Sequence, residues 1–443
     1  MYIYDVIGVG FGPANIALAI AMEELSFQGK ALFLEARADA TWQENMLFED
    51  SDIQNHPLRD LVTPRNPQSY YSFTNFLHKK GRFFQHLNSN FHLPLRIEFA
   101  QYISWVAGHF DHLVQYQTPV MRIERIEHDG QRIYQLTDRG GKTYHARMAV
   151  VAPGRTPHLP PVFDGLESPR AIHLNHYLKT LNELALDSLD RIAVVGGSQS
   201  AVEIMLHLSE RFPQSDVIGI KRCYGYKQKD VNPFTGEVYF PDFVDLFHAS
   251  DRPTKRRLIA DLHYTNYSAS DADVLDRLYQ RMYQQKIQQR EKIVVHRSAN
   301  VTGVEVREDG QLMLTIDKLE REEAVRERVG LVILATGFKN IGTRENEEPY
   351  PRILQPLIEA IQLDETGCID TNYDYSLTMK GEALRTCFLN GLCESSHGMG
   401  DAGSFSLLAL RSQLILQSLN DTLQHHKTQS RQRRATPTKA VPS

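Results

Sequence analysis

The apolar positions at the start of the chain change from a strand-like run to a helical spacing across a glycine-rich turn. Residues 2–9 form a β-branched apolar run, which predicts a buried strand. Glycines follow at residues 8–12, and apolar positions at residues 16–22 then recur with a helical spacing. The next apolar run, residues 31–34, ends in the carboxylate of Glu35. This order predicts a dinucleotide-binding unit whose acid accepts a hydrogen bond from a free ribose hydroxyl.

The same pattern recurs in the middle of the chain. An apolar run at residues 191–195 leads into a second glycine turn at residues 196–201, and a helical spacing of apolar residues follows. The next run, residues 216–220, ends in Lys221 and Arg222 instead of an acid. Cations at this place suit the 2′-phosphate of NADPH, although solvated surface charges would produce the same pattern.

Two such units predict an α/β fold with two Rossmann-like dinucleotide-binding domains, the first for FAD and the second for NADPH. We expect the FAD domain to be discontinuous, with parts at residues 1–160 and 325–425. The NADPH domain is expected at residues 165–325, with a small, mostly helical substrate region near residues 225–285. Residues 426–443 are rich in Gln, Arg, Thr and Pro and contain no acid, which predicts a disordered tail.

The composition narrows the range of partners. A formal net charge of −5 over 443 residues leaves no basic surface for nucleic acid, so the partner should be a small molecule. No apolar run reaches the ~18 residues of a membrane helix, and the N-terminus lacks a signal-peptide pattern, so we expect a cytoplasmic protein without a membrane partner. The four cysteines show no CxxC pairing, which argues against a metal site or a redox disulfide: Cys223, Cys368, Cys387 and Cys393.

The first glycine turn and several other short segments form recognisable motifs. They are GVGFGPAN at 8–15, LRDL at 58–61, RNP at 65–67, TNYS at 265–268, ATGF at 335–338 and SHG at 396–398. Together they resemble the flavin-dependent N-hydroxylating monooxygenases of siderophore biosynthesis, the L-ornithine and L-lysine N-monooxygenases. The resemblance covers about residues 4–420.

The resemblance implies an enzyme that uses FAD, NADPH and dioxygen to hydroxylate a primary amine. NADPH reduces FAD, dioxygen adds to give a flavin 4a-hydroperoxide, and the neutral amine takes the distal oxygen. Because most of this chemistry belongs to the flavin, no side chain is expected to act as an acid or base. His397 is accordingly interpreted as a structural histidine at a glycine-rich turn.

The resemblance also assigns roles to single residues. Those expected at FAD are Gly8, Gly10, Gly12, Pro13, Glu35, Trp42, Met46 and Gln54. Those expected at NADPH are Gly196, Gln199, Ser200, Lys221 and Arg222. Those expected at the substrate are Arg59, Asn266, Ser406 and Leu407, with Asn266 and Ser406 supporting catalysis. Two alternatives stay open: the Gln54 amide satisfies local backbone groups, and Ser406 caps the apolar helix that follows it.

Two departures from the family pattern concern the substrate. Arg59 stands where the ornithine enzymes have a lysine that binds the substrate α-carboxylate, and a guanidinium also binds a carboxylate. Gly236 stands where the family has an asparagine, so one donor is missing. The cation of Arg59 favours L-ornithine or L-lysine as substrate. The missing donor favours the alternative, a decarboxylated amine such as putrescine, cadaverine or histamine.

Two other classes share the plan of two nucleotide sites. A flavin disulfide reductase needs a cysteine pair in the first domain, and residues 1–222 contain no cysteine. An NADPH- and FAD-binding redox sensor would partner another protein and form no hydroxylamine. The family resemblance also suggests a homo-oligomer, either a tetramer or a dimer.

Overall fold

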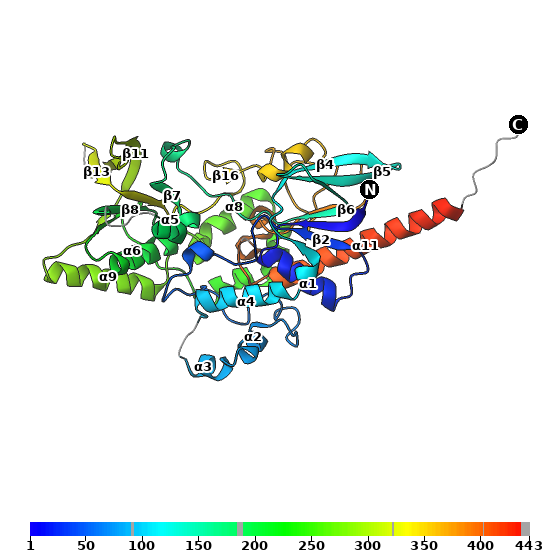
Figure 1. The fold of residues 1–443 in the computed structure, drawn as a ribbon, viewed down its shortest axis with the longest axis horizontal. Coiled ribbons are helices and arrows are strands. Elements are labelled where there is room, and N and C mark those ends of the chain that lie inside the picture. The colour runs from blue at the N-terminus through cyan, green and yellow to red at the C-terminus, as the bar shows by residue number, and fades with distance from the viewer. Residues whose placement is uncertain (90–92, 184–188, 321–322, 402, 436–443) are drawn as a thin grey trace, which may run out of the picture.

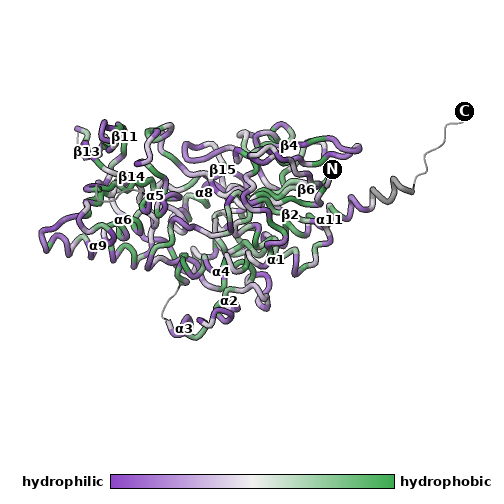
Figure 2. The backbone as a smooth tube through the Cα atoms, viewed as in Figure 1, coloured by the Kyte–Doolittle hydropathy of each residue, from purple (hydrophilic) through white to green (hydrophobic). Residues whose placement is uncertain are grey.

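The computed structural model describes residues 1–89, 93–183, 189–320, 323–401 and 403–435. Two lobes lie side by side along the long axis, one blue and cyan with the N-terminus, the other green and yellow (Figure 1). Figure 2 shows apolar colour along strands inside the lobes, such as β2 and β6. Within the described ranges, no helix combines the length and the apolar character that crossing a bilayer requires.

The first lobe is built on a seven-stranded sheet in the order β3-β2-β1-β6-β5-β4, with β17 added beside β6. Its strands are β1 (Ile3–Val9), β2 (Ala31–Leu34), β3 (Val114–Gln115), β4 (Val120–His128), β5 (Gln131–Asp138), β6 (Thr143–Val151) and β17 (Cys387–Leu389). β1 is parallel to β2 and β6, whereas β4, β5 and β6 are antiparallel. β17 pairs in parallel with β6, so a segment far along the chain completes the first sheet.

The second lobe is built on a parallel sheet in the order β10-β9-β8-β14-β7. Its strands are β7 (Ala171–His173), β8 (Arg191–Val195), β9 (Asp216–Ile220), β10 (Ile293–His296) and β14 (Leu331–Leu334). The boundary expected at residue 325 is wrong, because β14 pairs with β8 and β7 and belongs to this sheet. All four β14 residues are buried, and a fully apolar strand does not reveal which of two sheets receives it.

The remaining strands form two smaller sheets. β11 (Ala299–Val306), β12 (Leu312–Lys318) and β13 (Val325–Val329) form an antiparallel sheet, and β15 (Asn340–Ile341) pairs with β16 (Glu347–Glu348). The helices are α1 (Pro13–Glu24), α2 (Phe73–Lys79), α3 (Phe83–Asn88), α4 (Arg96–Gly108), α5 (Tyr177–Glu183), α6 (Gln199–Arg211), α7 (Pro241–Ala249), α8 (Arg252–Asp261), α9 (Ala272–Ile287), α10 (Glu394–His397) and α11 (Leu408–Ala435). Residues 225–285 thus carry α7, α8 and most of α9.

The long helix α11 packs along α1 and then extends beyond the first sheet (Figure 1). Residues 426–435 belong to this helix, so the tail expected from residue 426 is wrong over that stretch. The reason is local: no glycine or proline interrupts the helix, and the first proline after it is Pro437. Residues 436–443 lie outside the described residues.

Each lobe contains the strand, glycine turn and helix that the sequence predicts. β1 leads through Gly10 and Gly12 into α1, and β8 leads through Gly196 into α6. The α/β class with two Rossmann-like units is therefore confirmed.

Candidate active site

The first glycine turn has no room for side chains at two of its glycines. A Cβ on Gly8 would lie 2.2 Å from the Phe33 ring. Gly10 has a φ of +84°, and a Cβ there would lie 2.4 Å from the Ala152 carbonyl oxygen. Gly12, the N-cap of α1, has nothing within 4 Å of its Cβ position. The turn is packed from behind and open at the helix N-terminus, which is the shape that a diphosphate needs.

Two further predicted residues complete this turn. Pro13 occupies the first helical position, where its missing N–H costs no hydrogen bond. Glu35 follows β2 and is buried, and its Oε2 accepts from the backbone N–H of Phe11 at 2.6 Å. Its Oε1 accepts from the backbone N–H of Arg37 at 2.9 Å. The carboxylate is therefore held against the glycine turn.

The second glycine turn repeats the close packing of the first. A Cβ on Gly196 would lie 2.3 Å from the carbonyl oxygen of Ala335, the residue after β14. Ser198 is the N-cap of α6, but its hydroxyl makes no capping hydrogen bond. The N–H of Gln199 donates to the Ala269 carbonyl at 3.1 Å and that of Ala201 to the Ser198 carbonyl at 3.0 Å. Among the described residues no hydrogen bond engages the N–H of Ser200, so this group of the first turn is left for an anionic ligand.

The two cations after β9 differ in exposure. Lys221 is only 3% exposed, its Nζ lies 3.8 Å from the ring centroid of Tyr226, and it has no hydrogen-bond partner among the described residues. Burial lowers its pKa to about 8. Arg222 is exposed. Arg222 is thus free to meet a phosphate at the surface, whereas Lys221 supports the turn from beneath.

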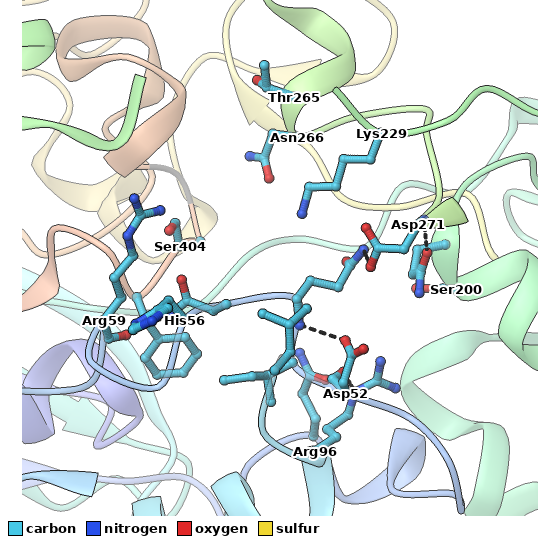
Figure 3. Close-up of a pocket in the computed structure, with 18 of the residues that line it drawn as sticks. Asp52, His56, Arg59, Arg96, Ser200, Lys229, Thr265, Asn266, Asp271 and Ser404 are labelled. Carbon is cyan, nitrogen blue, oxygen red and sulfur yellow. Dashed lines mark hydrogen bonds between the residues drawn. The ribbon is translucent and has the colours of Figure 1, made fainter. Parts of the chain in front are cut away.

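A cavity of about 1200 Å³ lies between the lobes. Seven predicted residues line it: Trp42, Met46, Gln54, Arg59, Gln199, Ser200 and Asn266. Figure 3 shows Arg59 on one side of this cavity, with Ser200 and Asp271 on the other. The remaining predicted residues, in the glycine turns, at Glu35, Lys221 and Arg222, and at 406–407, lie outside its lining. A dinucleotide is long enough to reach from a glycine turn into the cavity.

A buried hydrogen-bond network joins the lobes beside the cavity. Nη2 of Arg96, on α4, lies 3.0 and 2.9 Å from the two carboxylate oxygens of Glu203, on α6. Nε2 of Gln199 donates to the same carboxylate at 2.8 Å, and Oε1 of Gln199 accepts from the Asp271 N–H at 2.8 Å. Nε2 of Gln54 closes the chain by donating to Asp271 Oδ2 at 2.7 Å. Gln54 therefore bonds to the opposite lobe rather than to local backbone.

The same network holds a carboxyl with a raised pKa. Asp52 Oδ1 accepts from the Gln54 N–H at 2.8 Å. The pKa of Asp52 is raised to about 6, mainly by burial and also by the nearby Asp271 and Glu203 carboxylates, while the hydrogen bond from Gln54 and the charge of Arg96 act in the opposite direction. Arg96, Glu203 and Asp271 could not be found from the sequence, because their partners lie far away along the chain and no local pattern pairs them. Asp52 could not be found because its burial beside these groups depends on the fold.

Arg59 is positioned by the residue that follows it. The Asp60 carboxylate is buried and accepts from the backbone N–H groups of Val62, Thr63 and Phe73 at 2.9, 2.6 and 2.7 Å. The Arg59 guanidinium lies 5.4 Å from the Tyr239 ring. Among the described residues, no hydrogen bond or ion pair engages it, so it remains available to an anionic ligand.

Asn266 lies on a loop that a second polar cluster supports. Its neighbour Tyr267 donates through its hydroxyl to Glu394, and Asn340 Nδ2 donates to the same carboxylate at 3.0 Å. Arg155 donates to Asn340 Oδ1 at 2.7 Å. This cluster ties the loop to both lobes while Asn266 faces the cavity (Figure 3).

The C-terminal wall of the cavity differs from the expectation for Ser406 and Leu407. Ser404 and Phe405 line the cavity, and the other two are buried behind them. The Ser404 hydroxyl donates to Ser406 Oγ at 3.0 Å. Ser406 Oγ lies 3.5 Å from Asn55 Oδ1, and α11 begins only at Leu408. A turn of two residues, which spacing alone does not reveal, decides which serine faces inward.

His397 is buried in an aromatic cluster away from the cavity lining. Its ring stacks on Tyr375 at 4.0 Å between centroids, and its Nδ1 lies 2.9 Å from Ser396 Oγ. Burial lowers its pKa to about 3. The contacts support the structural interpretation of this histidine.

The comparisons with known proteins agree with this geometry. The family profile described as L-lysine 6-monooxygenase/L-ornithine 5-monooxygenase matches residues 2–340. The chain is 34% identical to the L-ornithine N(5)-monooxygenase of Pseudomonas aeruginosa in an alignment of 437 positions that covers 94% of each chain.

Two solved structures are similar over nearly the whole chain. One is the Kutzneria sp. 744 ornithine N-hydroxylase with reduced FAD, NADP⁺ and L-ornithine, at 30% identity and a TM-score of 0.87. The alignment covers 95% of this chain and 99% of that one. The other is the L-lysine 6-monooxygenase of Pseudomonas syringae, at 30% identity and a TM-score of 0.83, covering 95% and 100%. The resemblance predicted from the motifs is confirmed, and this chain belongs to the L-lysine 6-monooxygenase/L-ornithine 5-monooxygenase family.

Proposed function

We propose that this protein uses FAD, NADPH and dioxygen to hydroxylate the side-chain amine of L-ornithine or L-lysine, supplying a hydroxylamine for a hydroxamate siderophore. The observation that carries the substrate assignment is the Arg59 guanidinium, which faces the cavity between the lobes without a protein anion. A carboxylate is the natural partner of such a group.

The described residues fit both cofactors. The open N-terminus of α1 behind Gly10 suits the FAD diphosphate, and Glu35 stands where a ribose hydroxyl would donate. The Ser198 hydroxyl makes no capping hydrogen bond to α6, and Arg222 is exposed for the 2′-phosphate of NADPH. FAD, when bound, supplies the reduced centre that activates dioxygen.

The protein's own task is to orient the amine and to exclude water. Trp42 and Phe405 meet edge to face at 5.2 Å and form an apolar part of the cavity wall. Asn266 offers an amide in the same lining, which suits a hydrogen bond to the substrate or to the nicotinamide nucleotide. A substrate bound at Arg59 by its carboxylate would extend its side-chain amine into the cavity.

Gly236 supports the alternative substrate class. It lines the cavity and has nothing within 4 Å of its Cβ position, so it offers no side-chain donor to a carboxylate. Putrescine, cadaverine and histamine would need none. Hydroxylamine formation coupled to NADPH oxidation, measured for these amines and for L-ornithine and L-lysine, tests the assignment. A higher kcat/KM for the amines without a carboxylate would contradict it.

The same assay tests the other functional classes. A redox sensor would consume NADPH without forming a hydroxylamine. A disulfide reductase would need cysteines at the flavin, but Cys223 is exposed on the second lobe, the other three thiols are buried, and none lines the cavity. We further propose a homo-oligomer, either a tetramer or a dimer, which light scattering of the purified protein would test.

A further inference from the structure

A second cation of the cavity comes from the segment before Gly236. The N–H of Lys229 donates to the Ser270 carbonyl at 2.8 Å, and the N–H of Ser270 donates to the Lys227 carbonyl at 2.9 Å. These bonds fix Lys229 beside the loop that carries Asn266. Figure 3 shows the Lys229 side chain reaching into the cavity between Asn266 and Asp271.

The Lys229 ammonium has no fixed anion. Among the residues that the structure describes, no hydrogen bond or ion pair engages Nζ. Burial lowers its pKa, while the attraction of Asp271 and Asp52 works in the opposite direction. An ammonium that is largely withdrawn from water without a partner gains most from an anionic ligand.

The carboxylates nearest to this lysine already have other partners. Asp271 accepts from Gln54 Nε2 at 2.7 Å, and Asp52 accepts from the Gln54 N–H at 2.8 Å. Arg59, in contrast, is as unpaired as Lys229. Within the described part of the chain, Arg59 and Lys229 are thus cations of the cavity lining without a hydrogen-bonded or ion-paired partner, and Asp52 and Asp271 are restrained by the Gln54 backbone and side chain. The lining also contains the acids Glu44, Asp230 and Asp273. This charge pattern suits a ligand that brings its own carboxylate.

We propose that Lys229 is a second anchor for the substrate α-carboxylate and, together with Arg59, selects amino acids over diamines. The proposal rests on the N-hydroxylation proposed above and identifies the part of the substrate that the site recognises. Lys229 takes over the contact that Gly236 lacks, from a position seven residues earlier in the same segment. A diamine would instead place a second ammonium near two cations, which is unfavourable.

The test compares Lys229→Met with Lys229→Arg. For Lys229→Met we expect KM for L-ornithine or L-lysine to rise about 10- to 100-fold, as for a lost charged hydrogen bond, with little change in kcat. KM for putrescine and cadaverine should stay constant or fall, and Lys229→Arg should retain most of the affinity for amino acids. Lys227→Met, which removes an exposed lysine two residues away, is the matched control and should leave every constant unchanged.

Calorimetric titration of L-ornithine into protein loaded with FAD and NADP⁺ gives a readout that does not depend on turnover. Weaker binding by Lys229→Met, with the same cofactor content, would support the proposal. An equal rise of KM for amino acids and diamines, or a rise confined to NADPH, would overturn it. Failure of the wild-type protein to hydroxylate any amine would instead contradict the proposed function, and the titration would still show whether Lys229 binds the carboxylate.

Discussion

The two glycine turns are built alike where the chain leaves the first strand and differ where the next strand ends. Gly10 and Gly196 both face a carbonyl oxygen of a neighbouring strand exit, at Cβ distances of 2.4 and 2.3 Å. In the first lobe, the strand after the turn, β2, is followed by Glu35, whose carboxylate accepts a hydrogen bond from the Phe11 N–H of the turn. The second turn meets Lys221, whose Nζ has no hydrogen-bond partner among the described residues.

The common feature, the packing of the glycine turn, suits any dinucleotide. The feature that differs, the charge after the next strand, selects one dinucleotide over another. Close packing of a glycine against a carbonyl shapes the turn for a diphosphate and is common to both lobes. The charge after the following strand distinguishes a ribose hydroxyl from a phosphate. Substitutions at the two levels should therefore have separable effects.

The largest expected effect comes from adding a methyl group at either turn. Gly10→Ala should yield protein without bound flavin and lower activity by more than about 100-fold, because the Cβ collides with the Ala152 carbonyl and disturbs cofactor placement. Gly196→Ala should retain flavin but lose its reduction by NADPH. Flavin absorbance and stopped-flow reduction separate the two outcomes.

Gly225→Ala is the control for this pair, because Gly225 is exposed and has nothing within 4 Å of its Cβ position. It should retain both flavin and reduction. If Gly10→Ala bound flavin normally, the assignment of the first turn to FAD would be wrong.

A smaller effect should appear at the cations of the second turn. Arg222→Ala should raise KM for NADPH about tenfold, as for one lost charged contact, and leave KM for NADH unchanged. Lys221→Met should change KM less, because Nζ is buried over Tyr226. Steady-state kinetics with both nucleotides measures this. The opposite ranking would mean that the buried lysine, rather than Arg222, reaches the phosphate.

The smallest effect concerns Asp52, a carboxyl beside the hydrogen-bond network that joins the two lobes. Asp52 has a pKa of about 6 in the folded protein, raised from 3.8 mainly by burial. Between these values the folded state binds more protons than the unfolded state, so this carboxyl lowers stability as pH rises from 3.8 to 6 and the loss is complete above pH 6. Asp52→Asn should therefore stabilise the protein at pH 8 by about 1–3 kcal/mol.

Melting temperatures of wild type and Asp52→Asn at pH 8 and pH 4 check this sign. The variant should melt a few degrees higher at pH 8, and the difference should shrink at pH 4, where the wild-type carboxyl is also protonated. Asparagine keeps an oxygen for the Gln54 N–H. A difference that grows towards pH 4 would contradict the raised pKa.

The local patterns were sufficient for the elements that carry the nucleotide turns. The runs at residues 191–195 and 216–220 became β8 and β9 with the expected bounds, because each is a short apolar strand bounded by a turn. Trp42, Arg59 and Asn266, which the resemblance assigned to the cofactor or the substrate, all line the cavity. The position of Ser406 behind Ser404 could not be predicted, because it depends on one turn of the backbone.

The sequence by itself determined the two dinucleotide turns, their order and the family of the chain, because these depend on neighbouring residues with short-range steric requirements. Only the tertiary structure decided which sheet receives β14, that Arg96 pairs with Glu203 across the lobes, and that Lys229 and Arg59 face one cavity. The physical reason is that a buried strand needs hydrogen-bond partners and a buried charge needs a counter-charge, and the tertiary fold decides which residues supply them. Such partners lie far away along the chain, as with Arg96 and Glu203, which are 107 positions apart.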